Sequence, residues 1–187
     1  SNPVPNGTWS TSTPSVLSLN PATGDIVGVS SGTAAVSYTT TAVNGCTTTT
    51  TANIAVQAIP VATIASSNGT SICQGTSTTL TAPAAASYAW NNGATTQSIA
   101  VAAGGSYSVV ITSAAGCVSN PSAPMALTVN QPPVVNVALN GPTSFCQGGS
   151  VSLTATGGVS YLWNNGSTTA TNTINASGTY FPIATDV

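Results

Sequence analysis

The chain is predicted to be all-β and to consist of small β-sandwich domains in tandem. Three observations lead to this prediction. Short runs rich in β-branched and aromatic residues recur along the 187-residue chain, and turn residues separate them roughly every 8–12 residues, as in β-sandwiches. No stretch of useful length has helical periodicity. A long segment also returns at a fixed offset, and the offset has the size of a small domain.

The strand signals can be placed along the chain by their composition. Several alternate apolar with polar residues, as a half-buried strand requires. Strands are expected at Thr33–Thr39, Thr78–Ala82, Ser87–Trp90, Ser98–Val101 and Ser106–Thr112. Thr47–Thr51, an unbroken run of threonine, is interpreted as a further strand, with a cluster of O-linked glycans as the alternative.

Two Asn-Gly pairs lie between strand signals, at Asn92-Gly93 and at Asn165-Gly166. Asn and Gly both tolerate a positive φ, which the common two-residue hairpin loops require. The two pairs are therefore predicted to form tight hairpin turns.

The repeat contains no gaps. Ser71–Thr96 returns as Ser144–Thr169, at an offset of 73 residues. The same offset relates Ile59-Pro60 to Pro132-Pro133, and proline both ends strands and stiffens joints. The expected domains are therefore a first domain at 1–58, a second repeat at 59–130 and a third repeat at 131–187.

The repeat also pairs its aromatic residues, Trp90 with Trp163 and Tyr107 with Tyr180. These four side chains are predicted to pack in the cores of the two repeats, because Trp90 shares a face with Tyr88 at the period of a strand. The alternative is that the two tryptophans are exposed and stack on sugar rings.

Composition excludes most chemistry. The chain has no Lys, Arg or His, and its acidic residues are Asp25 and Asp186 alone. General acid–base catalysis, metal binding and neutralisation of nucleic-acid phosphates all need side chains that are missing here. No catalytic site, metal site, cofactor or nucleic-acid partner is therefore expected. No apolar run approaches the roughly 20 residues of a membrane-spanning helix.

The cysteines indicate a disulfide. Cys73 and Cys117 both lie in the second repeat and are predicted to be bonded, which would stabilise this repeat by about 3–4 kcal/mol. Cys146 matches Cys73, and Cys46 occupies the place of Cys117. The partners of these two are expected outside this sequence, with the first domain lacking its beginning and the third repeat its last strand. The alternative is free buried thiols. Disulfides imply an oxidising compartment.

Four asparagines lie in N-glycan acceptor patterns, although a chain rich in Ser and Thr produces such matches by chance. The possible acceptors are Asn6, Asn68, Asn165 and Asn175.

The landmarks CQG, SYxWNNG, GxY and GC within about Ala58–Val187 resemble the short immunoglobulin-like repeats of giant secreted proteins of the Bacteroidetes. The first domain resembles the bacterial group-2 immunoglobulin-like domain, which intimin-like adhesins carry. Its landmarks are Gly7-Thr8-Trp9-Ser10, Pro21-Ala22-Thr23-Gly24, Ile26-Val27-Gly28 and Gly32-Thr33-Ala34. The complete absence of basic residues departs from both patterns.

These resemblances imply tandem immunoglobulin-like sandwiches that are exported across the outer membrane, often by the type IX system, and displayed at the bacterial surface. The leading hypothesis is a non-catalytic stalk of an adhesin, which projects or multiplies a binding tip in attachment or gliding. Its partners would be neighbouring repeats of the same polypeptide, with surface glycans or self-association in addition. The alternatives are a carbohydrate-binding module of a secreted enzyme and a subunit of a self-assembling extracellular filament.

Overall fold

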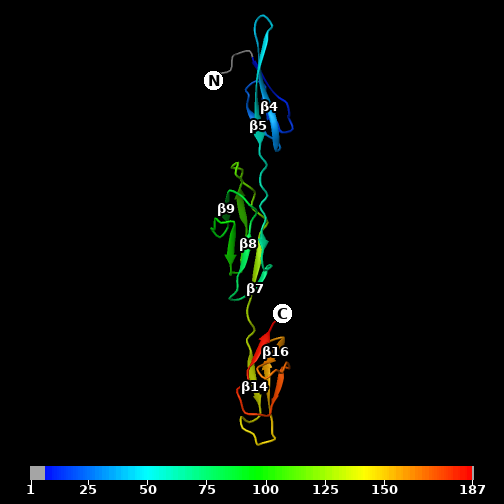
Figure 1. Ribbon diagram of the computed structural model, residues 1–187, viewed down its shortest axis with the longest axis vertical. Coiled ribbons are helices and arrows are strands. Elements are labelled where there is room, and N and C mark those ends of the chain that lie inside the picture. The colour runs from blue at the N-terminus through cyan, green and yellow to red at the C-terminus, as the bar shows by residue number, and fades with distance from the viewer. Residues whose placement is uncertain (1–6, 187) are drawn as a thin grey trace. The chain divides into compact units, whose positions relative to one another are not determined.

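The computed structural model describes residues 7–186, and the regular elements in this range are strands (Figure 1). The prediction of an all-β fold is confirmed. The described chain forms two compact units. One holds the residues up to Ser66 together with Thr79–Ile99 and Ser106–Met125. The other holds Ser67–Thr78, Ala100–Gly105 and the residues from Ala126 onward.

The strands are numbered in chain order. They are β1 (Gly7–Thr11), β2 (Leu17–Leu19), β3 (Ile26–Gly28), β4 (Gly32–Thr41), β5 (Thr47–Val56), β6 (Ala65–Ser66), β7 (Ser71–Cys73), β8 (Thr78–Thr81), β9 (Ser87–Trp90), β10 (Ser98–Val101), β11 (Gly105–Tyr107), β12 (Val109–Thr112), β13 (Met125–Asn130), β14 (Asn136–Asn140), β15 (Val151–Thr156), β16 (Ser160–Trp163), β17 (Thr171–Ile174) and β18 (Pro182–Thr185).

The first domain is built on an antiparallel sheet of order β1-β4-β5, beside the small hairpin β2-β3. Leu17, Ala34 and Val36 form its buried centre. The threonine run Thr47–Thr51 lies in β5, where Thr49 shares a hydroxyl hydrogen bond of 2.8 Å with Thr39 of β4. The strand predicted for this run is present.

The second repeat contains the sheets β10-β8-β6, β11-β13-β7 and β9-β12. Two strands predicted from the sequence, Ser87–Trp90 and Ser98–Val101, have the observed bounds. The strand predicted at Ser106–Thr112 is instead broken at Ser108, between β11 and β12. At this break the Asn91 side chain bonds to the backbone in place of a neighbouring strand. Its Oδ1 accepts from Ser108 N at 3.0 Å, and its Nδ2 donates to Ser106 O at 2.7 Å.

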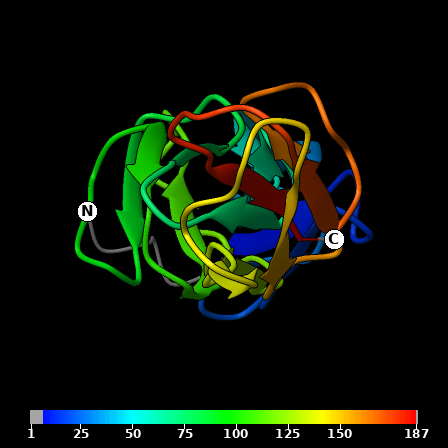
Figure 2. The same ribbon diagram turned by 90° about the horizontal axis from the view of Figure 1, so that it is seen from below.

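The third repeat, coloured yellow to red in Figure 2, contains the sheets β14-β15-β17 and β16-β18. Its strands match those of the second repeat in register. Ala65 of β6 faces Thr81 of β8, and the residues 73 positions later, Ala138 and Thr154, face each other in the same way. The sequence repeat is therefore also a repeat of strand pairing.

Both Asn-Gly pairs form tight turns, although they are not hairpins. Gly93 and Gly166 have φ of 87° and 89°, and each N–H donates to the carbonyl of the tryptophan three residues earlier at 2.9 Å. The strands that flank the first turn, β9 and β10, belong to different sheets. The hairpin prediction is wrong because each turn passes the chain from one sheet to another.

The four cysteines are free thiols in this structure, so the expected disulfide between Cys73 and Cys117 is not formed. Cys73 ends β7, which pairs with β13, whereas Cys117 follows a turn after β12, where its N–H donates to Ser113 Oγ at 3.2 Å. Cys73 lies in a sheet and Cys117 lies outside the strands, and the two residues belong to different compact units. Cys46 and Cys146 are exposed.

Candidate functional site

The two tryptophans of the repeats lie in the interior. Trp90 is 4% exposed and Trp163 is 1% exposed. Each indole N–H donates to a backbone carbonyl, that of Thr96 at 2.8 Å and that of Thr169 at 2.9 Å. These rings are hidden from solvent, so in this structure they offer no face to a sugar.

The matched tyrosines differ from each other. Tyr107 is buried in β11, which pairs with β13. Tyr180 lies outside the strands, is half-buried, and donates its hydroxyl to Ala176 O at 3.1 Å. The prediction of a core position is therefore wrong for Tyr180, which lies half-buried outside the strands, whereas Tyr107 lies in β11 beside β13. It lines a shallow hollow of about 390 Å³ instead.

The possible glycan acceptors are spread over the chain. Asn68 is exposed, and its Nδ2 donates to Ser77 O at 3.3 Å. Asn165 exchanges side-chain hydrogen bonds with the buried Asn172, at 3.3 and 3.1 Å. Asn175 is exposed after β17. Asn6 lies outside the described residues.

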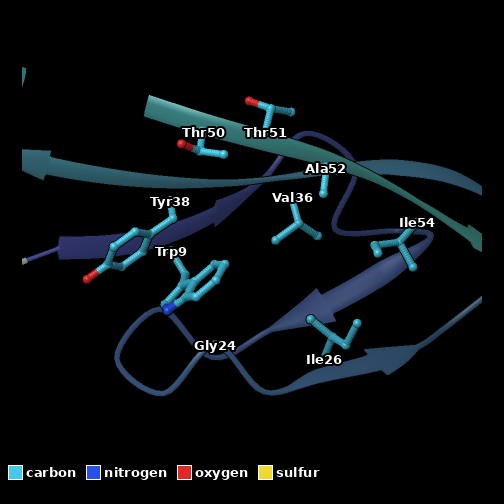
Figure 3. A pocket seen from close by; sticks show the side chains of 9 residues that line it. All are labelled: Trp9, Gly24, Ile26, Val36, Tyr38, Thr50, Thr51, Ala52 and Ile54. Carbon is cyan, nitrogen blue, oxygen red and sulfur yellow. The ribbon is translucent and has the colours of Figure 1, made fainter. Parts of the chain in front are cut away.

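A hollow with an apolar lining belongs to the first domain. It has a volume of about 430 Å³ and opens over one face of the sheet β1-β4-β5 (Figure 3). Its lining residues are Trp9, Gly24, Ile26, Val36, Tyr38, Thr50, Thr51, Ala52 and Ile54. We call this hollow the Trp9–Tyr38 pocket.

Strand register explains how this pocket forms. Trp9 of β1 faces Tyr38 of β4, and Tyr38 in turn faces Thr50 of β5, so the three side chains form a row across the sheet. Val36 and Ala52 face each other in the next row of the same face, since alternate residues of a strand share a side. Side chains at every second position of these strands therefore make this face of the sheet largely apolar.

The two aromatic rings contact each other. Their centroids are 4.6 Å apart and their planes are inclined by 43°, a spacing at which aromatic pairs attract. In Figure 3 both rings lie at one end of the pocket, with the aliphatic side chains of Val36, Ile26 and Ile54 toward the other end. The pair gives the pocket one flat aromatic wall.

A tight turn holds the indole of Trp9 in place. Gly24 has a φ of 79°, and a Cβ added there would lie 2.7 Å from the indole ring, so only glycine allows this close approach. The backbone N–H of Trp9 donates to Pro21 O at 3.1 Å. The indole N–H itself is buried and makes no hydrogen bond with the described residues.

The chemistry available to the pocket is contact and weak hydrogen bonding. Its lining contains no ionisable carboxyl, amine or imidazole, and its polar side-chain groups are the hydroxyls of Tyr38, Thr50 and Thr51 and the buried indole N–H of Trp9. Across residues 7–186 there is no cluster of His, Cys, Asp or Glu placed to hold a metal ion, and no helix long and apolar enough to cross a membrane. The lining suits an uncharged ligand with a flat apolar face.

The sequence interpretation did not single out this pocket. The sequence marks Trp9 as a landmark of the first domain and places Tyr38 in the predicted strand Thr33–Thr39. The alternation Ala34, Val36, Tyr38 was the signal that could have found it, because it places these side chains on one face. The register of Trp9 against Tyr38 could not be read from the sequence.

Comparisons with known proteins do not place the chain in a family. No protein-family model matches it, and no curated protein does. Among solved structures the chain is similar to SGBP-B of the mixed-linkage glucan utilization locus of Bacteroides ovatus, in complex with mixed-linkage heptasaccharide. The two are 13% identical, with a TM-score of 0.23, over 92% of this chain and 60% of that chain. A TM-score this low does not establish a shared fold.

Proposed function

We propose that this chain is a non-catalytic stalk region of a large adhesin at the bacterial cell surface. The observation that carries the proposal is that the second and third repeats make the same hydrogen bonds at the same offset. The Trp-Asn-Asn-Gly segment is held in each repeat by the indole bond, the turn bond and the two bonds of Asn91 or Asn164.

The hydrogen bonds that the two repeats share belong to the structural framework. The shared bonds all satisfy backbone groups, and the residues that make them position strands and turns. Neither repeat gathers a distinctive cluster of reactive or charged side chains among its described residues. Repetition of a scaffold without a site supports a role in spacing or valency.

The resemblance to secreted immunoglobulin-like repeats and the uncharged surface support an extracellular location. Export by the type IX system and a part in attachment or gliding belong to this proposal. Partners of the stalk are then the neighbouring repeats of the same polypeptide.

Deletion of one period from the parent protein tests the proposal. Removing Pro60–Pro132 takes out one full offset and joins Ile59 to Pro133, which restores an Ile-Pro joint. Cells displaying the shortened protein should adhere as well as the parent, at equal surface density measured by antibody binding. A matched deletion of the parent's tip should abolish adhesion. Loss of adhesion on removing Pro60–Pro132, with display intact, would contradict the stalk function.

The Trp9–Tyr38 pocket favours a second candidate function, glycan binding by the first domain. Its aromatic wall and hydroxyl groups suit the apolar face and hydroxyls of a sugar ring. A glycan array followed by calorimetry tests this. Trp9→Phe and Tyr38→Leu should weaken binding about tenfold by removing aromatic contact. Thr48→Ala, on exposed β5 outside the pocket, is the control. Unchanged affinity in both pocket variants would reject the pocket as the glycan site.

A further inference from the structure

Asn-Gly dipeptides form matched turns in all three domains. Gly45, Gly93 and Gly166 have φ of 86°, 87° and 89°. The N–H of each glycine donates at 2.9 Å to the backbone carbonyl of the residue three positions earlier. A Cβ added at any of the three glycines would meet no atom within 4 Å, so solvent reaches each turn at its glycine.

The asparagine before each of these glycines makes the same first contact. Its Oδ1 accepts a hydrogen bond from the backbone N–H two residues later, at 3.2 Å for Asn44, 3.2 Å for Asn92 and 3.3 Å for Asn165. All three asparagines are exposed. This contact uses the side-chain oxygen and leaves Nδ2 to bond elsewhere.

The three turns differ in what Nδ2 contacts. Asn44 and Asn92 make no Nδ2 hydrogen bond with any of residues 7–186. Asn165 donates its Nδ2 to Asn172 Oδ1 at 3.3 Å, and its Oδ1 accepts from Asn172 Nδ2 at 3.1 Å. Asn172 is 4% exposed, and the matching position in the second repeat is the buried Ile99. The third repeat therefore holds its turn asparagine from the interior.

Two further Asn-Gly pairs lie in the described range, and both asparagines have a bonded Nδ2. Asn68 donates to Ser77 O at 3.3 Å, and Asn140 donates to Thr154 Oγ1 at 2.7 Å. The Asn-Gly pairs of residues 7–186 thus divide into those with a free Nδ2, in the turns at positions 44 and 92, and those with a bonded Nδ2, at positions 68, 140 and 165.

An asparagine followed by glycine can undergo a reaction that needs water alone. The glycine backbone nitrogen loses its proton to water and attacks Cγ of the asparagine, which forms a cyclic succinimide. The Cγ–Nδ2 bond breaks, and the departing nitrogen takes up a proton and leaves as ammonia. Water then opens the ring at one of its two carbonyls and gives aspartate or isoaspartate. Glycine favours the attack because it has no Cβ to crowd its nitrogen.

We propose that Asn44 and Asn92 are sites of deamidation in the folded protein, and that Asn172 protects Asn165 from the same reaction. Cγ has to turn toward the glycine nitrogen, and Nδ2 has to depart. At Asn44 and Asn92 these movements break no Nδ2 hydrogen bond. At Asn165 both bonds to Asn172 have to break first, which should slow the reaction about tenfold.

The reaction changes the electrostatics of the chain. The carboxyl of an aspartate or isoaspartate is ionised at neutral pH. The formal net charge is −2, so reaction at both turns doubles it. Like charges oppose the close approach of two chains. Older molecules should therefore associate with one another less readily than newly made ones.

Incubation of the folded 187-residue chain at mildly alkaline pH, followed by peptide mapping, tests the proposal. Chymotrypsin suits the mapping, since the chain has no Lys or Arg for trypsin. Mass spectrometry should find aspartate and isoaspartate accumulating at Asn44 and Asn92, with Asn165 about tenfold slower. Asn91 is the internal control, because it lies in the same turn but is not followed by glycine, and it should not react on this timescale.

A matched substitution isolates the role of Asn172. Asn172→Ile gives the third repeat the residue that the second repeat has at position 99. Asn165 should then react at the rate of Asn92, with the strand signal in circular dichroism unchanged. In the urea-unfolded parent chain, all the Asn-Gly pairs should react at similar rates, because the protecting hydrogen bonds are absent. This second measurement decides the proposal even where the variant does not fold.

Four results would overturn the proposal. Equal rates at Asn92 and Asn165 in the folded chain would show that the bonds to Asn172 do not protect. The same order of rates in urea would assign the difference to neighbouring sequence. Asn44 and Asn92 reacting in urea but not in the folded chain would show that the turns themselves prevent the attack. Continued protection of Asn165 in a folded Asn172→Ile variant would remove Asn172 from the account.

Discussion

Trp90 and Trp163 have nearly the same surroundings in the second and third repeats, yet the strands that follow them do not. Around each tryptophan the turn bonds and the asparagine bonds are reproduced to within a few tenths of an ångström. Beyond this centre the second repeat has β7 and β11 paired with β13, and Ser119 and Ser122 bond to the backbone of β12. Tyr107 is buried in β11, whereas the matching Tyr180 is half-buried and lies outside the strands.

The comparison distinguishes the local geometry of turn and core from the burial of neighbouring strands. Turn and core geometry depend on residues close together in sequence, so a copied motif copies them. Burial of Tyr107 and of β12 depends on residues outside the motif, and the matching Tyr180 and β18 are more exposed. Copying the motif therefore copies the geometry around the tryptophan but not the burial of the strands beside it.

The largest expected effect tests whether the two centres are equivalent. Trp90→Ala and Trp163→Ala should each destabilise their own repeat by about 3–5 kcal/mol, because both rings are buried and both indole N–H groups are bonded. Hydrogen exchange measured separately on peptides of each repeat would report the losses. Leu162→Ala, at an exposed position beside Trp163, is the control and should cost less than about 0.5 kcal/mol. A much smaller loss in the third repeat would show that its core is not a copy of the second.

The second-largest loss of stability is expected at Ser119, whose hydroxyl accepts a hydrogen bond from Ile111 N in β12. Ser119→Ala should destabilise the second repeat by about 1–3 kcal/mol, because the buried Ile111 N–H loses its acceptor. Exchange at Val109–Thr112 should rise, and exchange in the third repeat should not change. Ser106→Ala, at an exposed position in the same repeat, serves as the control. Equal acceleration in both repeats would mean that β12 and β18 are not independent edges.

Local patterns predicted the fold more successfully than the contacts between distant segments. Strands β9 and β10 were predicted with their observed bounds, because alternation and composition act within a few residues. The break at Ser108 was missed because the Asn91 side chain causes it from another strand. The Trp9–Tyr38 pocket was missed for the same reason, since it depends on the register of β1 against β4. The disulfide is predicted because both cysteines lie in the second repeat, but membership of one repeat does not say which element holds each cysteine.

A smaller effect is expected from the two asparagines that directly follow β9 and β16. Asn91→Ala and Asn164→Ala each remove two hydrogen bonds from exposed side chains to backbone, so each should cost about 1–2 kcal/mol. Thermal unfolding of the two variants should show similar shifts. Asn53→Ala, exposed on β5, should show almost none. A large difference between the first two would indicate that the network around one tryptophan is not needed for its repeat.

The smallest effect isolates the backbone of the two turns. Gly93 and Gly166 have positive φ, and a Cβ added at either position would meet no atom within 4 Å. Alanine there would be strained by backbone conformation alone, at a cost of about 1 kcal/mol in each repeat. Because the two turns share their φ values and their hydrogen bonds, the single variants should match and the double variant should show the sum. Urea unfolding of the three variants measures these losses of stability.

Gly45→Ala is the reference for backbone strain without a neighbouring tryptophan, because Gly45 of the first domain has φ of 86° and equally open surroundings. A cost at Gly93 and Gly166 well above that at Gly45 would show that the turns also support the indole bonds, and that turn and core in each repeat form one cooperative unit.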